Sequence, residues 1–329
     1  MAVAPAVPRG WDEASIPLLS DRRFLVTGGT SGLGLATAKT LSSLGAHVTI
    51  TARNPQKAQA VLHAGAAHDV LEMDLADLAS VRRAATQVSE PYDVVILNAG
   101  IMWTPYALTT DGFESQLGTN HLGHFAFAGL IKDFITQRLV SVSSLYHRYG
   151  NFGDGSIEEI RRRCEGQVPY DSRSAYGDSK LANLLFIEEI ERRRATYGWK
   201  FIAVAAHPGW SSTNLFDAAT STRGLFGKVT SLSSRVLAQS AARGALPTLC
   251  AATFPGLLGG EFLGPRGPGE LRGSPKLVHP VPKADDPRLA GNLWQVSEEL
   301  TGVSWELWRH YSQDCSALAT RGPGRCRRR

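Results

Sequence analysis

Long hydrophobic runs are absent from the sequence. No stretch of its 329 residues approaches the ~18–20 consecutive apolar residues that a membrane-spanning helix needs. Residues 1–20 contain three prolines and two acidic residues, and they have neither the basic start nor the apolar run of a signal peptide. We therefore expect a cytoplasmic protein without a membrane span, in which residues 1–20 form an extension that is either flexible or ordered by contact.

Cysteine is scarce, and no two cysteines form a CxxC pair. The four are Cys164, Cys250, Cys315 and Cys326. Reduced thiols are expected in a long chain without a secretory leader, and we interpret Cys164 as an incidental thiol. His121 and His124 lie close together, but no acidic partner completes a metal-binding set. We expect no metal, and we interpret both as helix-surface or packing histidines.

The excess of positive charge is small and local. The formal net charge is +5, and the last nine residues alone contain five arginines. A short Gly-, Pro- and Arg-containing segment is typically disordered, so we expect a disordered basic tail over residues 313–329. The remainder is nearly neutral, and no nucleic-acid partner is expected.

Short apolar runs alternate with helical patterns from residue 23 onward. The expected buried strands are 24–26, 47–50, 94–97, 139–142 and 201–205, and the expected helices are 33–44, 55–63, 78–88, 112–134 and 174–197. This alternation predicts one α/β domain over residues 21–312, with a Rossmann-type doubly wound parallel sheet and helices on both faces. Further along, we expect a short strand at 261–263 in an otherwise loop-like stretch (256–276), a helix at 284–300, and packing of 305–311 against the domain.

A glycine-rich string joins the first strand to the first helix. It reads TGGTSGLG from Thr27 to Gly34. Glycines allow a tight turn and let backbone N–H groups approach a pyrophosphate, while the helix offers its positive N-terminal end. The residues expected to contact a dinucleotide here are Gly28, Thr30, Ser31, Gly32, Leu33 and Gly34.

The end of the second strand indicates which dinucleotide the site binds. An NAD-preferring site places a carboxylate there, whereas this chain reads Thr51-Ala52-Arg53. The guanidinium of Arg53 can receive a 2′-phosphate, although it is also compatible with an ordinary surface arginine. We therefore expect NADP(H) in preference to NAD(H).

Tyr176 and Lys180 stand four residues apart on a predicted helix, and thus on one face of it. A free tyrosine has a pKa near ~10, and a nearby ammonium is expected to lower that pKa. Such a tyrosine can exchange a proton with the oxygen of a carbonyl or an alcohol while a hydride moves. Ser144 ends a predicted strand at the same edge of the sheet, where it can hydrogen-bond that oxygen. A YxxxK pair alone is common by chance.

Six motifs occur together in one order: TGGTSGLG, LNAG, TNHLGHF, VSS, AYGDSKLANLLF and HPGWSST. Over residues 23–262 they resemble the short-chain dehydrogenase/reductase family. NHLGHF and SKLAN resemble its retinol-dehydrogenase-like and protochlorophyllide-reductase-like branches. GELRG and EELTG are similar to segments of bacterial members.

The resemblance implies site residues. Asn120, Ser144, Tyr176 and Lys180 would form a catalytic tetrad, in which Asn120 holds a water and Lys180 also binds the nicotinamide ribose. The remaining implied cofactor contacts are Asp74, Leu75, Asn98, Ala99, Gly100, Pro208, Gly209 and Thr213. Structural interpretations stay open for three of these residues: Asn120 as a helix-distorting residue, Ser144 as a turn former, and Asp74 as a turn or N-cap aspartate.

The expected activity is hydride transfer between NADP(H) and a small-molecule carbonyl or alcohol. Several residues near the expected cleft suggest an apolar or aromatic substrate, or else loop packing: Met102, Trp103, Phe152, Tyr170, Trp210, Leu215 and Phe216. The long segment 145–175 lies beside the site as a substrate-loop insert. Two alternatives stay open: reduction of an activated C=C bond, and a non-catalytic NADP-binding sensor or scaffold. Assembly into a homo-oligomer also stays open.

Overall fold

Eight strands form one sheet in the computed structural model, which describes residues 4–210 and 240–306. The strands are β1 (Arg23–Val26), β2 (His47–Ala52), β3 (Asp69–Glu72), β4 (Tyr92–Leu97), β5 (Ile135–Val142), β6 (Ile202–Ala206), β7 (Phe262–Pro265) and β8 (Pro275–Val278). Their order is β3-β2-β1-β4-β5-β6-β7-β8, and every neighbouring pair is parallel except β7 and β8. The chain order reverses between β1 and β4, as in a doubly wound sheet, so the predicted fold class is confirmed.

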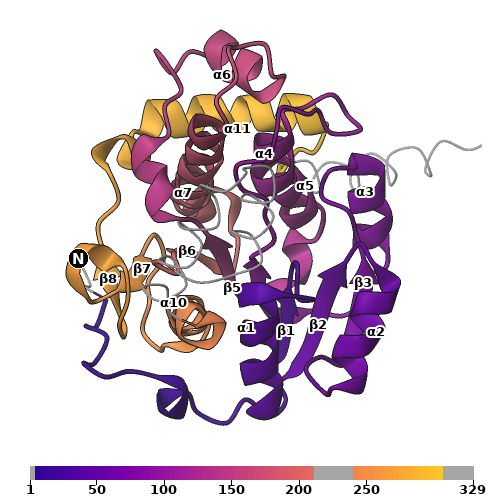
Figure 1. Cartoon of the computed structure of the whole chain (residues 1–329), viewed down its shortest axis with the longest axis vertical. Helices are drawn as coiled ribbons and strands as arrows, with labels where there is room; N and C mark the ends of the chain where they lie inside the picture. Colours follow the sequence, from indigo (N-terminus) through magenta and orange to yellow (C-terminus); the bar gives the residue numbers. More distant parts are fainter. Residues whose placement is uncertain (1–3, 211–239, 307–329) are drawn as a thin grey trace, which may run out of the picture.

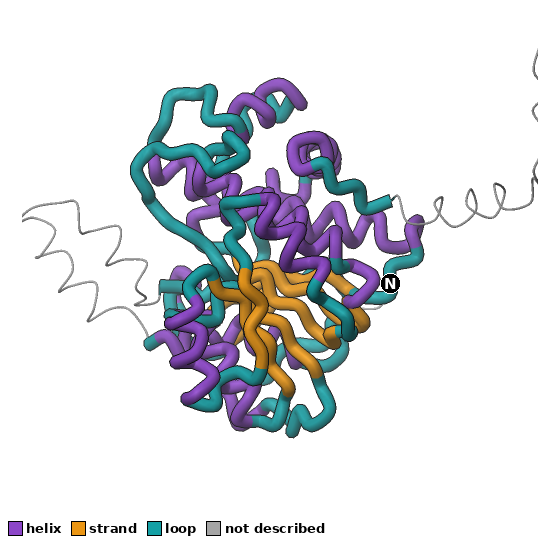
Figure 2. Tube along the Cα trace, turned by 90° about the vertical axis from the view of Figure 1, so that its right-hand side faces the viewer, coloured by secondary structure: helices purple, strands orange, loops and turns teal. Residues whose placement is uncertain are grey.

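Helices cover both faces of this sheet (Figures 1 and 2). They are α1 (Gly32–Ser43), α2 (Pro55–His63), α3 (Leu78–Thr86), α4 (Ser115–Leu117), α5 (Gly123–Leu130), α6 (Ile157–Cys164), α7 (Ser172–Tyr197), α10 (Ala241–Thr253) and α11 (Pro287–Thr301). One core lies between the sheet and α3, α5 and α7, and it includes the inner face of α11. The other lies under α1, α2 and α10. No helix among the described residues is long and apolar enough to cross a membrane.

Alternate residues of each central strand point into the two cores. In β1, Leu25 belongs to the first core, whereas Phe24 and Val26 belong to the second, and all three are fully buried. A strand buried on both faces needs apolar residues at every position rather than at every second one. This requirement explains why uninterrupted apolar runs marked the strands in the sequence.

The N-terminal extension packs against the second core. Val7, Trp11, Ile16 and Leu19 are each at most 5% exposed. Of the two interpretations of residues 1–20, ordering by contact is the one that the described part of this segment adopts. At the other end of the chain Trp305 is buried, as expected, whereas the proposed tail at 313–329 lies outside the described residues.

Several predicted boundaries were wrong. The stretch expected to be one helix over 112–134 is divided into α4, a π-helical turn (Gly118–Leu122), α5 and a short 3₁₀ turn. The short strand expected at 261–263 is confirmed as β7, whereas the start of β8 lies in a stretch expected to be loop. Strand β8 begins at Pro275 on the edge of the sheet, where a residue without an N–H is tolerated. Because proline usually indicates a loop, the strand was not predicted from the sequence.

An aromatic cluster closes the first core beneath α11. The Trp294 ring lies 5.1 Å from that of Phe125 and 5.2 Å from that of Trp305. Replacing Trp294 with alanine should lower the free energy of unfolding by about 3–5 kcal/mol, as for other large-to-small core changes. Urea denaturation measures this loss. Leu18→Ala is the control, because Leu18 is 81% exposed and should change stability by less than about 0.5 kcal/mol. Equal losses in the two variants would contradict the assigned core.

Candidate active site

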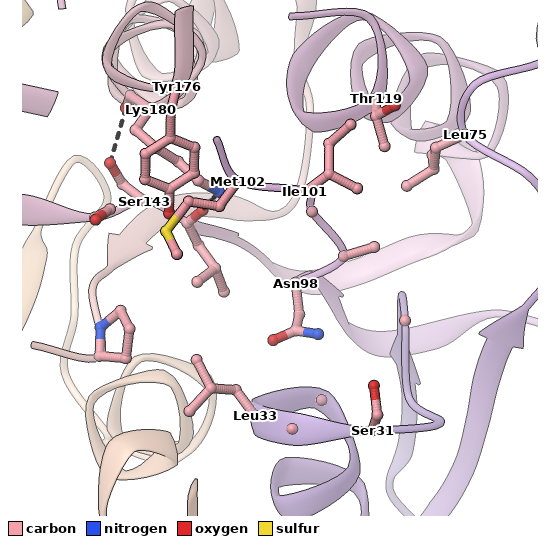
Figure 3. A pocket seen from close by; sticks show the side chains of 18 of the residues that line it. Ser31, Leu33, Leu75, Asn98, Ile101, Met102, Thr119, Ser143, Tyr176 and Lys180 are labelled. Carbon is pink, nitrogen blue, oxygen red and sulfur yellow. Dashed lines mark hydrogen bonds between the residues drawn. The ribbon is translucent and has the colours of Figure 1, made fainter. Parts of the chain in front are cut away.

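A cavity of about 700 Å³ opens at the carboxyl ends of the parallel strands. Its wall is formed by the segments that follow β1, β2, β3, β4, β5 and β6, together with the start of α7. Of the residues predicted from sequence, those that line it are Gly28, Thr30, Ser31, Gly32, Leu33, Gly34, Arg53, Asp74, Leu75, Asn98, Ala99, Gly100, Ser144, Tyr176, Lys180, Pro208 and Gly209. Asn120 is not among the lining residues, and Thr213 lies outside the described residues. Figure 3 shows the two ends of the site, with Ser31 and Leu33 facing Tyr176 and Lys180 across the cavity.

The glycine-rich loop is shaped by close backbone contacts. Gly28 has a φ of +68°, and a Cβ on Gly34 would lie 2.4 Å from the carbonyl oxygen of Gly28. Thr27 ties this loop to the end of β4, because its hydroxyl accepts hydrogen bonds from the backbone N–H groups of Asn98 (2.8 Å) and Ala99 (2.9 Å). No larger residue fits at Gly34, so glycine at this position lets the start of α1 pack directly against Gly28 and Asn98.

Helix α7 carries Tyr176 and Lys180 in its first three turns, after Asp171 caps its start. The Lys180 ammonium donates a hydrogen bond to the carbonyl oxygen of Val142 at the end of β5 (3.0 Å). Ser143 donates its hydroxyl back to the carbonyl oxygen of Lys180 (2.8 Å), the contact drawn in Figure 3. These two bonds fix the start of α7 against the segment that contains Ser144.

Burial sets the protonation of the two side chains. It raises the pKa of Tyr176 to about 12, against a smaller lowering by a hydrogen bond with the Ser144 side chain. It lowers the pKa of Lys180 to about 8. The expectation that Lys180 lowers the pKa of Tyr176 is therefore wrong for the chain by itself. The Lys180 nitrogen lies over the ring, 5.7 Å from its centre, and desolvation of the phenol is the largest influence on the pKa of Tyr176. Tyr176 is accordingly a protonated phenol at neutral pH.

Asn120 is fully buried and lies in the π-helical turn. Its side-chain amide donates to the carbonyl oxygen of Ile101 (2.9 Å) and to the hydroxyl of Ser179 (2.9 Å), while its Oδ1 accepts from the N–H of Ile101 (2.8 Å). Each side-chain hydrogen bond thus joins Asn120 to a neighbouring element rather than to the cavity. This geometry agrees with the interpretation of Asn120 as a residue that distorts the helix.

Ser144 and Asp74 keep both of their interpretations. The Ser144 hydroxyl accepts from the backbone N–H of Tyr146, which caps a 3₁₀ turn, and it also bonds Tyr176. Asp74 accepts from the N–H of Ala76 (3.0 Å) in a tight turn, whereas the N-cap of α3 is Asp77. Both residues line the cavity all the same.

The two histidines after Asn120 pack inside the protein rather than on a helix surface. His124 joins the carbonyl oxygen of Asn120 (3.0 Å) to the hydroxyl of Thr27 (2.9 Å), and burial lowers its pKa to about 4. His121 meets the hydroxyl of Ser297 (2.9 Å). Cys164 is fully buried and burial raises its thiol pKa, which agrees with an incidental thiol.

Sequence reasoning missed several residues that line the cavity: Lys57, Tyr146, Arg148, Tyr149 and Leu271. Lys57 lies in the first turn of α2, behind its cap Asn54, and projects from the same end of the cavity as Arg53. Its signal was the sequence Arg-Asn-Pro followed two residues later by lysine, which places both cations at one helix start. Of the apolar residues expected near the substrate, Met102 and Trp210 line the cavity, whereas Leu215 and Phe216 lie outside the described residues.

A doubly wound parallel sheet with a glycine-rich loop at the carboxyl end of β1 is the architecture of Rossmann-type nucleotide-binding proteins. Comparison with known proteins narrows this class. A family model described as short chain dehydrogenase matches residues 22–155. The chain belongs to the short-chain dehydrogenase family and is an oxidoreductase.

Two relatives and one solved structure illustrate the likeness. Short-chain dehydrogenase TIC 32 B, chloroplastic, from Brassica napus is 34% identical over 294 residues, which cover 84% of this chain and 87% of that protein. Retinol dehydrogenase 14 from Mus musculus is 35% identical over 314 residues, which cover 87% of both chains. A crystal structure of a protein from Mycobacterium paratuberculosis is 41% identical with a TM-score of 0.77, and the match covers 91% of this chain and 100% of that one.

A buried carboxyl beside the Tyr176–Lys180 pair provides a test of the site's electrostatics. Asp178 forms an ion pair with Arg163 (3.1 Å), yet burial raises its pKa from 3.8 to about 6. A carboxyl with a raised folded-state pKa contributes stability below its unfolded pKa and loses it as pH rises through the folded value. The stability advantage of the wild type over Asp178→Asn should therefore shrink by up to about 3 kcal/mol between pH ~4 and ~7.

Urea denaturation across that pH range measures the change. Asp133→Asn is the matched control. The Asp133 side chain is 66% exposed, so the difference in stability between the wild type and this variant should change little across the pH range. A constant difference between the wild type and Asp178→Asn across the range would show that the pKa of Asp178 is not raised.

Proposed function

We propose that the protein is an NADP(H)-dependent oxidoreductase that interconverts a carbonyl and an alcohol, with Tyr176 as the proton donor and acceptor. The observation that carries this proposal is the arrangement at one end of the cavity. There Tyr176 is hydrogen-bonded to Ser144, and the Lys180 nitrogen lies over the Tyr176 ring, opposite the glycine-rich loop.

The described residues fit a bound NADP(H) molecule. Gly28, Gly32 and Gly34 line the cavity beside the N-terminus of α1, where backbone N–H groups can approach a pyrophosphate. Arg53 and Lys57 are both exposed and line the far end of the cavity, and β2 ends without a carboxylate. Two cations at this position favour a 2′-phosphate over a free ribose hydroxyl. This set favours NADP(H) over NAD(H).

When bound, NADPH supplies a hydride. Tyr176 then donates the proton of its hydroxyl to the carbonyl oxygen as the carbonyl carbon receives the hydride, and the product is an alcohol. Ser144 holds the same oxygen, and the ammonium of Lys180 stabilises the phenolate that remains. In the reverse direction the phenolate accepts the proton from the alcohol.

The other end of the cleft favours an apolar or aromatic substrate. Its lining includes Met102, Tyr146 and Leu271. The Tyr146 ring lies 5.6 Å from that of Tyr176 and 5.4 Å from that of Tyr149. Tyr149 is 70% exposed, so aromatic surface extends from the proton donor to the rim.

Cofactor preference is tested at the two cations. Arg53→Ala and Lys57→Ala should each weaken NADPH binding by about 1.5–3 kcal/mol, the value of a charge-assisted hydrogen bond, and should leave NADH binding nearly unchanged. Isothermal titration calorimetry with both cofactors measures the difference. Lys39→Ala, at an exposed position on α1, is the control. Equal weakening of NADPH and NADH would refute the assignment of this end of the cavity.

The proton donor is tested by removing one hydroxyl. Tyr176→Phe should fold and bind NADPH as the wild type does, because the ring packing survives. Its kcat should fall by about 10²-fold or more through loss of general acid–base catalysis. Tyr106→Phe removes an exposed hydroxyl outside the cavity and should be silent. Near-normal turnover in folded Tyr176→Phe would exclude the mechanism and leave a dinucleotide-binding protein with its chemistry elsewhere.

A further inference from the structure

The loop between β7 and β8 contains a glutamate in an unusual backbone conformation. Glu270 has a φ of +58°, a region that L side chains rarely adopt, and it follows Gly269 at +60°. Among the described residues only Asp21 and Trp103 are other non-glycine residues with positive φ. Glycine would adopt this conformation without strain, so the presence of a glutamate points to a use for its carboxylate.

The carboxylate of Glu270 holds a buried histidine. Its Oε2 lies 3.1 Å from Nε2 of His207, and the same oxygen accepts from the guanidinium of Arg148 (3.1 Å). His207 is fully buried, and a Cβ on Gly264 would lie 2.1 Å from its Nε2. The glycine of β7 therefore makes the space that the imidazole occupies beside Glu270.

The partners of His207 define its tautomer. Nδ1 lies 3.2 Å from the backbone nitrogen of Gly209, and an N–H can only donate, so Nδ1 is the acceptor. The ring proton is then on Nε2, where it is donated to the carboxylate of Glu270. Burial lowers the pKa of His207, which agrees with a neutral ring.

The same loop makes a second attachment to the cavity wall. The N–H of Trp210 donates to the carbonyl oxygen of Leu271 (2.8 Å), and a Cβ on Gly209 would lie 2.5 Å from that oxygen. Pro208, Gly209 and Trp210 all line the cavity, and Arg148 belongs to the 3₁₀ turn that Ser144 begins. Glu270 thus connects three segments around one end of the site.

We propose that Glu270 is a positioning residue that fixes the segment 208–210 through the Nε2–H tautomer of His207, so that this segment presents a formed wall to the nicotinamide half of the cofactor. The expected effect on cofactor binding rests on the proposed NADP(H) function. The hydrogen bonds from Glu270 through His207 to Gly209 are present in the chain without cofactor.

Three variants test the relay. Glu270→Gly removes the carboxylate and relieves the backbone strain, so it should fold at least as well as the wild type. Glu270→Gln keeps an oxygen that can accept from Nε2–H. Asp21→Gly is the matched control, because it relieves the same kind of backbone strain (φ +64°) at an exposed position outside the cavity.

Two readouts are measured for each variant. In the protein without cofactor, ¹⁵N spectra of histidine-labelled protein report the tautomer of His207, and fluorescence titration gives the Kd for NADPH. Glu270→Gly leaves the Nε2 proton of His207 without its carboxylate acceptor, so a population of the Nδ1–H tautomer should appear. NADPH should then bind about tenfold more weakly, as expected for loss of a hydrogen bond to a charged group. Glu270→Gln should restore the tautomer and bring the Kd within about twofold of the wild type, and Asp21→Gly should change neither readout.

The outcomes separate this inference from the proposed function. An unchanged tautomer in Glu270→Gly would overturn the inference, whether or not NADPH affinity fell, because the effect would not pass through His207. A changed tautomer with unchanged affinity would also overturn it. If the wild type binds no NADPH, the proposed cofactor is wrong, and the tautomer comparison still decides whether Glu270 orients His207.

Discussion

Helix α7 is fastened to the end of β5 by hydrogen bonds that run in both directions. Lys180 donates its ammonium to the carbonyl oxygen of Val142, and Ser143 donates its hydroxyl to the carbonyl oxygen of Lys180. The helix also approaches the turn after β5 closely, since a Cβ on Gly177 would lie 2.9 Å from the backbone nitrogen of Gly150. The position of Tyr176 beside Ser144 depends on this attachment, and so does the burial that keeps its phenol protonated.

The insert at 145–175 reinforces the same helix from outside. Asp178 accepts from the backbone N–H of Asn151 (2.6 Å) and pairs with Arg163 of α6, so two separate points of the insert are tied to one residue between Tyr176 and Lys180. Helix α11 packs across α7 and α6. The side chains proposed as catalytic, Tyr176 and Lys180, therefore project from a helix that neighbouring segments hold in place, as expected for a site that needs close positioning. On the side of β6 and β7, Glu270 contacts His207, whose ring accepts from the N–H of the cavity-lining Gly209.

Much of this architecture could be predicted from the sequence, because the determinants are local. Strands buried on both faces appear as apolar runs, and residues such as Gly28, Asn98 and Ser144 follow those runs directly, so they meet at one edge of the sheet. Other features depend on contacts between distant segments. Glu270 and His207 are 63 residues apart, and nothing in either neighbourhood announces the pair. The inward turn of the Asn120 amide and the raised pKa of Tyr176 also follow from packing that only the folded chain defines.

In the proposed reaction, a hydride passes to a carbonyl carbon while Tyr176 protonates the oxygen. It is tested most directly by supplying NADPH deuterated at the transferred position with a panel of apolar and aromatic aldehydes, ketones and enones, and locating the label by mass spectrometry and NMR. We expect one deuterium on the carbinol carbon of an alcohol product. Deuterium on the carbon β to an intact carbonyl, or no product across the panel from protein that binds NADPH, would contradict it.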